Sequence, residues 1–420
     1  MSALPVRPGL SQDDDRGDII GLEAIMRLAY GGADLGGIWA DLLARTEADP
    51  CDAAALMDMS IILMVSGHRE AALETQGRAL ALRRSYRTVH GRGGGLRVLA
   101  LVTAGDFMAN TPVDLLLSGS DVTLHLHYVD AETPDLDGVP AHDIAFLAVA
   151  EAPPHRAILE RCGLLLRDWP GPLLNGAAER IAALTRDEAC TLFAGEPAVH
   201  APLTVRAGRK ILTGIATGAI PVADLIPGAE FPLIVRPVGT HAGVGLEKLD
   251  TPGAVGVYLA MHTDAQFYVA PFVNYASPDG KFRKQRIAFI KGRAYPSHLA
   301  ISDDWMVHYL SAGMAADPAR RAEEARWMET FDADVAVRHA DAFAALSRRL
   351  GLDYFGVDCA ELPDGRLLLF EADVAMIVHD LDPEDVFPYK KPAMRRLFAA
   401  FQAELARSAG HEAGGDAPLP

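Results

Sequence analysis

Cysteine is scarce in this chain, and the first residues contain no long apolar run. The four cysteines are scattered without a CxxC pair, so the sequence predicts neither a zinc site nor a disulfide framework. They are Cys51, Cys162, Cys190 and Cys359. The longest apolar run near the start, residues 53–66, is interrupted by Asp58. It is shorter than the roughly 20 residues that span a bilayer, so no membrane segment is expected.

Positive charge is also in short supply. The chain has 39 Lys and Arg against 56 Asp and Glu, a formal net charge of −17. This charge repels phosphate backbones and anionic lipid, which argues against nucleic acid or membrane as a partner. Any anionic ligand therefore needs a local basic cluster. Asp13, Asp14 and Asp15 stand where a signal peptide would be basic and then apolar, and we expect a cytoplasmic protein.

Hydrophobic residues make up 50% of the chain, enough for more than one core, and the length predicts roughly two to four domains. Residues 1–95 have a helical pattern, with a bend at Gly67 and with Ala72 and Ala79 seven residues apart. This spacing resembles one tetratricopeptide repeat (TPR), whose period is about 34 residues. Two interpretations are open: a helical hairpin packed on the next domain, or a TPR-like array that binds a protein partner.

The pattern changes after residue 95. In residues 96–200, apolar strand-like segments alternate with helical ones, which predicts a parallel α/β sheet. Residues 201–408 are rich in strand-like segments and contain a charged helical region at 319–350. Residues 409–420 have a composition typical of disorder.

Two carboxylates end an apolar strand-like segment near residue 370. Asp364 and Gly365 form the dipeptide that two-residue type I′ hairpin turns prefer. Counted outward from this turn, Asp358 lies opposite Glu371, and Asp373 shares the face of Glu371 because side chains alternate along a strand. A three-residue turn would instead turn Asp358 away. The crowded carboxylates would repel each other without a divalent cation, so we predict that these three residues bind Mg²⁺, with Mn²⁺ as an alternative.

A glycine-rich loop is a candidate phosphate site. In FPLIVRPVGTHAGVGLEK, residues 231–248, Arg236 is followed by Gly239, Thr240, Gly243 and Gly245. The backbone N–H groups of such a loop can approach phosphate oxygens. No helix-forming stretch follows, which separates the loop from the P-loop and the dinucleotide fingerprint, since both open a helix. A plain structural turn is the alternative interpretation.

Basic residues gather next in GKFRKQRIAFIKGR, residues 280–293. The segment contains Lys284 and Arg286, and Arg286 heads an apolar strand-like stretch. That position favours a guanidinium held in place, whereas a solvated face is the alternative.

Taken in order, these segments resemble the ATP-grasp superfamily, most of all the glutathione-synthetase and RimK-type ligases. The resemblance covers residues 96–405. It implies an α/β and α+β fold, with a pre-ATP-grasp α/β domain over 96–200 and an ATP-grasp domain over 201–408, joined to the all-α TPR-like region. It also implies that ATP is bound by the basic strands and the glycine loop: Arg236, Gly239, Thr240, Gly243, Gly245, Lys284 and Arg286.

The implied reaction is ATP-dependent ligation of a carboxylate to an amine. ATP phosphorylates the carboxylate, the amine attacks the acylphosphate, and ADP and phosphate leave, with Arg286 and Arg236 stabilising charge. The sequence departs from the family where Arg236 replaces a usual Lys and Pro271 a usual hinge Glu, and where Arg186 or Asp187 lies near the position of another usual Lys. These departures motivate an alternative, a non-ligating ATP-binding scaffold or sensor whose TPR-like region binds a protein.

Candidate substrate residues follow the basic strand. They are His298, Ser302, Asp304 and His308, with His379 just beyond the carboxylate hairpin. For the histidines, a structural role is the alternative. Lys390 and Lys391 either hold a substrate carboxylate or flank a helix start. The expected substrates are small-molecule or peptide carboxylates and amines, and a homodimer is left open.

Overall fold

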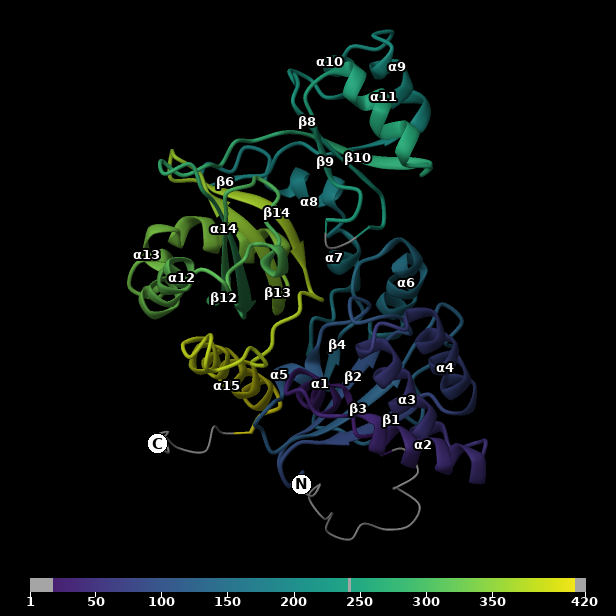
Figure 1. The fold of residues 1–420 in the computed structure, drawn as a ribbon. Helices are drawn as coiled ribbons and strands as arrows, with labels where there is room; N and C mark the ends of the chain where they lie inside the picture. The colour runs from purple at the N-terminus through teal and green to yellow at the C-terminus, as the bar shows by residue number, and fades with distance from the viewer. Residues whose placement is uncertain (1–17, 241–242, 412–420) are drawn as a thin grey trace.

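The computed structural model describes residues 18–240 and 243–411. The acidic run at residues 13–15 and the chain from residue 412 on, where disorder is expected, lie outside the described residues. In the described part of the chain, the strands form three sheets (Figure 1). No helix of that part is both long and apolar enough to cross a membrane.

The N-terminal region is mainly helical. Its helices are α1 (Leu22–Tyr30), α2 (Gly36–Ala48), α3 (Ala53–Val65) and α4 (Arg69–Leu82). Asp52 caps α3 by accepting the Ala55 N–H at 2.9 Å, and Gly67 has the positive φ of 83° that the bend between α3 and α4 requires. The predicted helical hairpin is therefore confirmed, whereas a tetratricopeptide array is not shown.

The region up to residue 95 is not wholly helical. Strand β1 (Ser85–Val89) pairs antiparallel with β3 (Thr123–Tyr128) of the following domain. Tyr86 of β1 is buried, and its hydroxyl donates to the Ala79 carbonyl of α4 at 2.9 Å. The helical hairpin is thus packed on the next domain, as one of the two interpretations has it.

The first sheet has the order β1-β3-β2-β4-β5. Its other strands are β2 (Arg97–Val102), β4 (Ile144–Leu147) and β5 (Leu173–Leu174). The helices of this part of the chain are α5 (Val113–Leu116), α6 (Arg156–Leu165), α7 (Ala178–Ala182) and α8 (Arg186–Leu192), with the 3₁₀ helix η2 (Pro153–His155) before α6. The strands from β3 to β5 run parallel, so the predicted parallel α/β sheet is confirmed. Strand β4 is buried along its whole length, as expected of a central parallel strand.

The second sheet is a small antiparallel one in the order β7-β10-β8-β9. Its strands are β7 (Val205–Gly208), β8 (Leu233–Pro237), β9 (Glu247–Leu249) and β10 (Gln266–Pro271), and its helices are α9 (Arg209–Ala216), α10 (Val222–Leu225) and α11 (Pro252–Met261). Apolar residues of sheet and helices form one cluster, in which Val235 and Phe267 meet Leu212 and Val255. This lobe stands at the top of Figure 1.

The third sheet has the order β12-β11-β13-β14-β6. Its strands are β6 (Val199–His200), β11 (Phe282–Ile290), β12 (Arg293–Ser302), β13 (Tyr354–Glu361) and β14 (Leu367–Asp373), and the helices that follow β12 and β14 are α12 (Pro318–Thr330), α13 (Val335–Arg338), α14 (Ala340–Leu350) and α15 (Lys390–Ser408), with the 3₁₀ helix η3 (Tyr309–Ser311) before α12. Strand β6 lies within residues 96–200 yet pairs with β14, so the chain enters the third sheet before residue 201.

Helix α15 joins the third sheet to the first. On β11, Ile287 and Phe289 belong to a cluster with Phe343 of α14. Ala288 and Ile290 point to the other face and belong to a cluster with α15 and the first sheet. The two faces of β11 therefore meet different helices, α14 on one face and α15 on the other.

The turn between β13 and β14 differs from the predicted one. Only Gly365 of the expected dipeptide has a positive φ, 87°, and its N–H donates to the Leu362 carbonyl at 2.9 Å. This is a longer loop, in which a turn is followed by a left-handed glycine, rather than a type I′ turn. The paired strands start with Glu361 opposite Leu367.

A β-bulge then restores the predicted register. Between Cys359 and Asp358 the pairing shifts by one residue on β14, so Asp358 lies opposite Glu371. The two-residue turn was wrong, and the pairing deduced from it was right, because the bulge compensates for the longer loop.

Candidate active site

A row of charged side chains crosses one face of the third sheet. Arg286 on β11 lies opposite Asp358 on β13, and Asp358 lies opposite Glu371 on β14. On the other side of β11, His298 of β12 lies opposite Arg286. Directly opposed residues share a face, so one histidine, one cation and two carboxylates stand side by side.

Asp358 is the buried centre of this row. Its side chain is 1% exposed and contacts the Lys284 Nζ at 2.8 Å. It also accepts two hydrogen bonds from Arg286, at 2.8 Å from Nε and 3.0 Å from Nη2. Burial raises the pKa of Asp358, but the charges of Arg286 and Lys284 outweigh burial and hold that pKa well below its ordinary value. The carboxylate therefore fixes two cations.

Glu371 and Asp373 differ in their partners. Glu371 forms an ion pair with Arg186 of α8, and although burial raises its pKa, Arg186 lowers it below the ordinary value. Asp373 accepts a hydrogen bond from the Ala375 N–H at 2.9 Å. Burial, and then the charges of Glu371 and Glu151, raise the pKa of Asp373 to about 7.

The fit of a divalent cation follows from these contacts. Both oxygens of Asp358 are bound by basic groups, and among residues 18–240 and 243–411 no three Asp, Glu, His or Cys side chains are grouped so as to hold an ion. Glu371 and Asp373 are neighbouring, partly exposed carboxylates that repel each other, and their oxygens are the ligands that Mg²⁺ prefers. This pair fits a cation better than Asp358 does, and the three-ligand assignment stays a prediction.

The glycine loop lies between β8 and β9. Gly239, Gly243 and Gly245 have φ values of 81°, 77° and 65°. A Cβ on Gly243 would lie 3.8 Å from the Met306 Sδ, whereas one on Gly239 would lie 3.6 Å from Pro153. The described ends of the loop therefore approach the first domain at Gly239 and the segment after β12 at Gly243.

Arg236 is turned toward its own loop. Its Nη2 donates to the Thr240 carbonyl and lies 3.2 Å from the Thr240 Oγ1. Its buried Nε has no partner among the described residues. Burial, and then the like charge of Arg186, lower the pKa of Arg236 to about 10. A buried guanidinium with an unused N–H group is suited to an anionic ligand.

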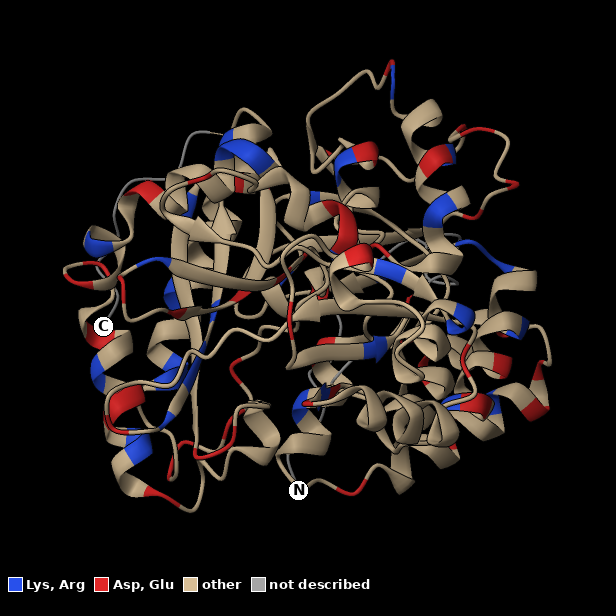
Figure 2. Cartoon of the chain, turned by 90° about the horizontal axis from the view of Figure 1, so that it is seen from above, with Lys and Arg blue, Asp and Glu red and all other residues tan. Residues whose placement is uncertain are grey.

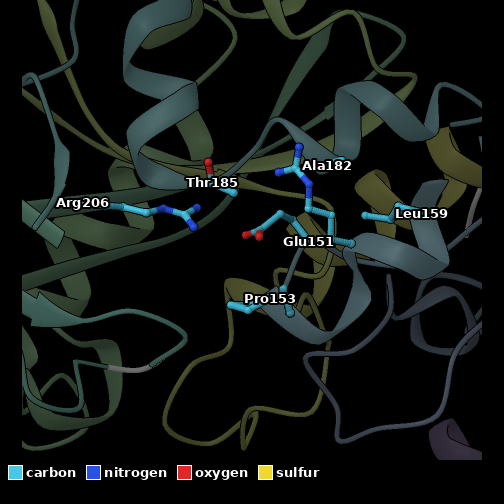
Figure 3. A pocket seen from close by; sticks show the side chains of 8 residues that line it. Glu151, Pro153, Leu159, Ala182, Thr185 and Arg206 are labelled. Atoms are coloured by element: carbon cyan, nitrogen blue, oxygen red, sulfur yellow. The ribbon is translucent and has the colours of Figure 1, made fainter. Parts of the chain in front are cut away.

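A small pocket beside the row contains residues that the sequence analysis missed. Glu151 follows β4, Arg206 lies on β7, and Figure 3 shows the two side chains pointing toward each other. Burial raises the pKa of Glu151. Arg206 contacts the Asp187 carboxylate at 2.8 Å and lies over the Tyr268 ring at 5.3 Å. Glu151 could have been found, because ligands bind at the carboxyl ends of parallel strands; Arg206 had no such signal.

The predicted histidines lie around the same cations. Burial, and then Arg286, hold the pKa of His298 well below its ordinary value, and burial followed by Lys284 lowers that of His308. Both imidazoles are therefore neutral near pH 7. Burial also lowers the pKa of His379, whose ring lies 5.6 Å from that of Tyr30 on α1.

The other predicted substrate residues have structural contacts. The Ser302 Oγ accepts the Asp304 N–H at 3.0 Å, which makes a turn at the end of β12, and Asp304 is exposed. Lys390 is buried at the start of α15, 3.1 Å from Asp382 and 3.8 Å from the Tyr309 ring centre. It thus has partners within the protein.

In Figure 2, Lys and Arg are spread among Asp and Glu over the whole cartoon. The cations of this region are a local cluster in an acidic chain: Arg186, Arg206, Arg236, Lys284 and Arg286.

The comparisons with known proteins give structural likeness alone. No protein-family model and no curated protein matches the sequence. A D-alanine–D-alanine ligase from Bacillus anthracis complexed with ATP is 10% identical, with a TM-score of 0.45 over 75% of this chain and 97% of that chain. The D-alanine–D-alanine ligase from Coxiella burnetii is 13% identical, with a TM-score of 0.43 over 75% and 97% of the two chains. A RimK domain ATP-grasp protein from Sphaerobacter thermophilus is 15% identical, with a TM-score of 0.37 over 73% and 98%. Since each TM-score is below 0.5, these likenesses carry no argument about the activity of this chain.

Proposed function

We propose that this chain is an ATP-grasp enzyme, an ADP-forming ligase that joins a carboxylate to an amine. The observation that carries the proposal is the row of Arg286, Asp358 and Glu371 on β11, β13 and β14. In a chain of net charge −17, cations gather at this row, beside a glycine loop. Such a cluster is what a polyphosphate requires in an acidic protein.

In the proposed mechanism, residues of the chain position the reactants and stabilise charge. Lys284 and Arg286, fixed by the buried Asp358, direct positive charge at the phosphoryl group as it moves from ATP to the substrate carboxylate. Arg236 and the backbone N–H groups of the glycine loop hold the other phosphate oxygens. Glu371 and Asp373 would hold Mg²⁺, which supplies charge neutralisation between the phosphates.

The second half of the reaction is attack by an amine on the acylphosphate. A C–N bond forms, the bond between the carbonyl carbon and the phosphate oxygen breaks, and phosphate leaves. The amine loses a proton, and His308, neutral near pH 7, is better suited to accept it than His298, whose pKa is lowered further and whose imidazole is the weaker base. The chemistry needs no nucleophilic side chain.

The second candidate is an ATP-binding scaffold or sensor that does not ligate. The observation that favours it is the contact of Arg236 with Thr240 of its own loop, where the family normally has a nucleotide-contacting Lys. In this case the helical region would perform the function through a protein partner.

One assay separates the two candidates. ADP release is measured with Mg²⁺, ATP and a panel of acids and amines, and ATP binding is measured by calorimetry with and without Mg²⁺. ADP formation that needs both an acid and an amine supports the ligase, whereas Mg²⁺-dependent binding without turnover supports the scaffold. If the chain binds no ATP, both candidates are wrong.

Variants at Glu371 test the metal assignment. Glu371→Gln keeps the shape and removes the charge, so Mg²⁺-dependent ATP binding should weaken at least about tenfold. Glu74→Gln on α4 is the matched control, because Glu74 is exposed and belongs to the N-terminal helical region. Equal binding by both variants would remove Glu371 from the proposal.

A further inference from the structure

A second cavity lies between the helical hairpin and the first sheet. It has a volume of about 110 Å³, and its walls come from α3 and α4 on one side and from β2, β3 and the loop after β2 on the other. Val102, Leu126 and Tyr128 line it from the strands, and Ile61 and Met64 line it from α3. An apolar cavity of roughly 150 Å³ takes up benzene, so this smaller one has room for at most a single small ring.

The position of the cavity is one where α/β sheets bind ligands. Val102 ends β2 and Tyr128 ends β3, two neighbouring parallel strands, and ligands bind outside the carboxyl ends of such strands. On the other side of β2 the space is closed, because Asn110 forms a bridge with Val149 and the Thr111 N–H donates to the Ala148 carbonyl at 2.7 Å. The free space therefore lies on the β3 side, beneath the helical hairpin.

Most polar side chains around the cavity already have protein partners. The Gln76 amide makes two hydrogen bonds with the backbone of Gly105, at 2.9 and 3.2 Å. The Asn110 amide makes two with the backbone of Thr103, both at 2.8 Å. The Ser60 hydroxyl donates to a backbone carbonyl of its own helix at 2.7 Å. These groups shape the cavity and need nothing from a ligand.

Thr111 is the exception. It is 3% exposed, and its hydroxyl has no hydrogen-bond partner in the described part of the chain. Buried polar groups are nearly always paired, since an unpaired one loses its bonds to water and gains none. The Tyr128 hydroxyl, on the same lining, has only a 3.7 Å contact with the Met57 Sδ. Thr111 and Tyr128 thus bring two hydroxyl groups to the lining of a largely apolar space.

We propose that this cavity binds an uncharged, ring-sized apolar group that carries one hydroxyl or N–H. The ring would lie against Ile61, Met64 and Leu126, and its polar atom would pair with the Thr111 Oγ1. Asp106 and Asp114 on the lining disfavour an anion, and both already have basic partners, Arg69 and His90, so neither is left to hold a cation. The site goes beyond the proposed ligase function, because it uses no residue of the charged row, and it exists only where the helical hairpin is docked on the sheet.

Toluene and p-cresol test the proposal as a matched pair, because p-cresol is toluene with one added hydroxyl. Binding to the full chain is followed by methyl NMR of Val102, Leu126 and Met64. Both compounds should shift these signals. Thr111→Val keeps the side-chain shape and removes the hydroxyl, so it should weaken p-cresol about fivefold, the net effect of one neutral hydrogen bond, and leave toluene unchanged.

A cavity-filling variant provides the second test. Met64→Trp should remove the binding of both compounds. Met261→Trp on α11 is the control, because Met261 is 72% exposed and belongs to the other lobe, and it should bind like the parent. The proposal is overturned if neither compound shifts the three signals at millimolar concentration, if Met64→Trp binds like the parent, or if Thr111→Val affects the two compounds equally.

Discussion

Asp358→Asn tests the centre of the charged row. Its carboxylate binds Lys284 and Arg286 through three contacts of 2.8 to 3.0 Å. Losing one partner of a buried ion pair typically costs about 3–5 kcal/mol. Lys284 and Arg286 keep side-chain exposures of 16% and 20%, and an Asn oxygen still accepts a hydrogen bond. We therefore expect the free energy of unfolding to fall by about 2–3 kcal/mol.

Urea unfolding followed by circular dichroism measures this loss. Asp364→Asn is the matched control on the same hairpin, because Asp364 also pairs with an arginine, Arg366 at 2.7 Å, but its side chain is 52% exposed. Exposed pairs contribute little to stability, so the control should unfold at nearly the same urea concentration as the parent. ATP binding should weaken in Asp358→Asn and stay unchanged in Asp364→Asn, because only the first variant removes the carboxylate that holds Lys284 and Arg286 in place.

A loss below about 1 kcal/mol in Asp358→Asn, no larger than that of the control, would refute this reasoning. A triple variant separates stability from binding: Asp358→Leu with Lys284→Met and Arg286→Met. Apolar replacement of a whole buried ion pair is often neutral or stabilising. The triple variant should therefore regain most of the stability, whereas its ATP binding should stay weak because both cations are gone.

Three further predictions concern the rest of the chain. Burial lowers the pKa of His90, but Asp114, 2.8 Å away, raises it above its ordinary value. The His90–Asp114 pair therefore stabilises the fold fully below about pH 6.5, and this stabilisation is lost as pH rises through the raised pKa. In urea melts, His90→Gln should reduce this fall of the unfolding free energy with pH. Gly245→Ala should weaken ATP binding about tenfold, because a Cβ there would lie 2.7 Å from Pro237 at a φ of 65°. Gly253→Ala on α11 should not, because a Cβ there would meet its nearest neighbour, the Thr251 Oγ1, only at 3.9 Å. Arg27→Met should lower the unfolding free energy by about 1–3 kcal/mol in the same melts, because it leaves a nearly buried carboxylate without its 2.7 Å partner.

Local pattern was enough to predict many of the elements. The alternation of strands and helices after residue 95 predicts the parallel first sheet, because a buried parallel strand is a continuous apolar run. The glycine bend at Gly67 predicts the α3–α4 hairpin. The pairing of Asp358 with Glu371 was also predicted, although through a turn that is wrong. A bulge leaves no local signal in the sequence, so only the end result of the register could be deduced from alternation.

The contacts that hold the candidate site together could not be predicted. Arg286 and Asp358 are 72 residues apart and meet because β11 and β13 are neighbours in the sheet, an order that periodicity along the chain does not contain. The sequence therefore predicts three carboxylates around a metal, whereas in the structure the Asp358 carboxylate binds Lys284 and Arg286. Arg186 comes from α8, near the second sheet, and reaches Glu371. Such pairs depend on how separate sheets face each other.

The position of the N-terminal helices links the two parts of the chain. Arg27 on α1 binds Asp380 at 2.7 Å, and Tyr30 contacts His379, so α1 touches the loop that follows the carboxylate hairpin. The helical region is also tied to the first sheet by β1, which pairs with β3. The helical region is therefore built into the body of the molecule. A partner protein could use only the surfaces that these contacts leave free, and anything that moved α1 would also move the loop beside the charged row.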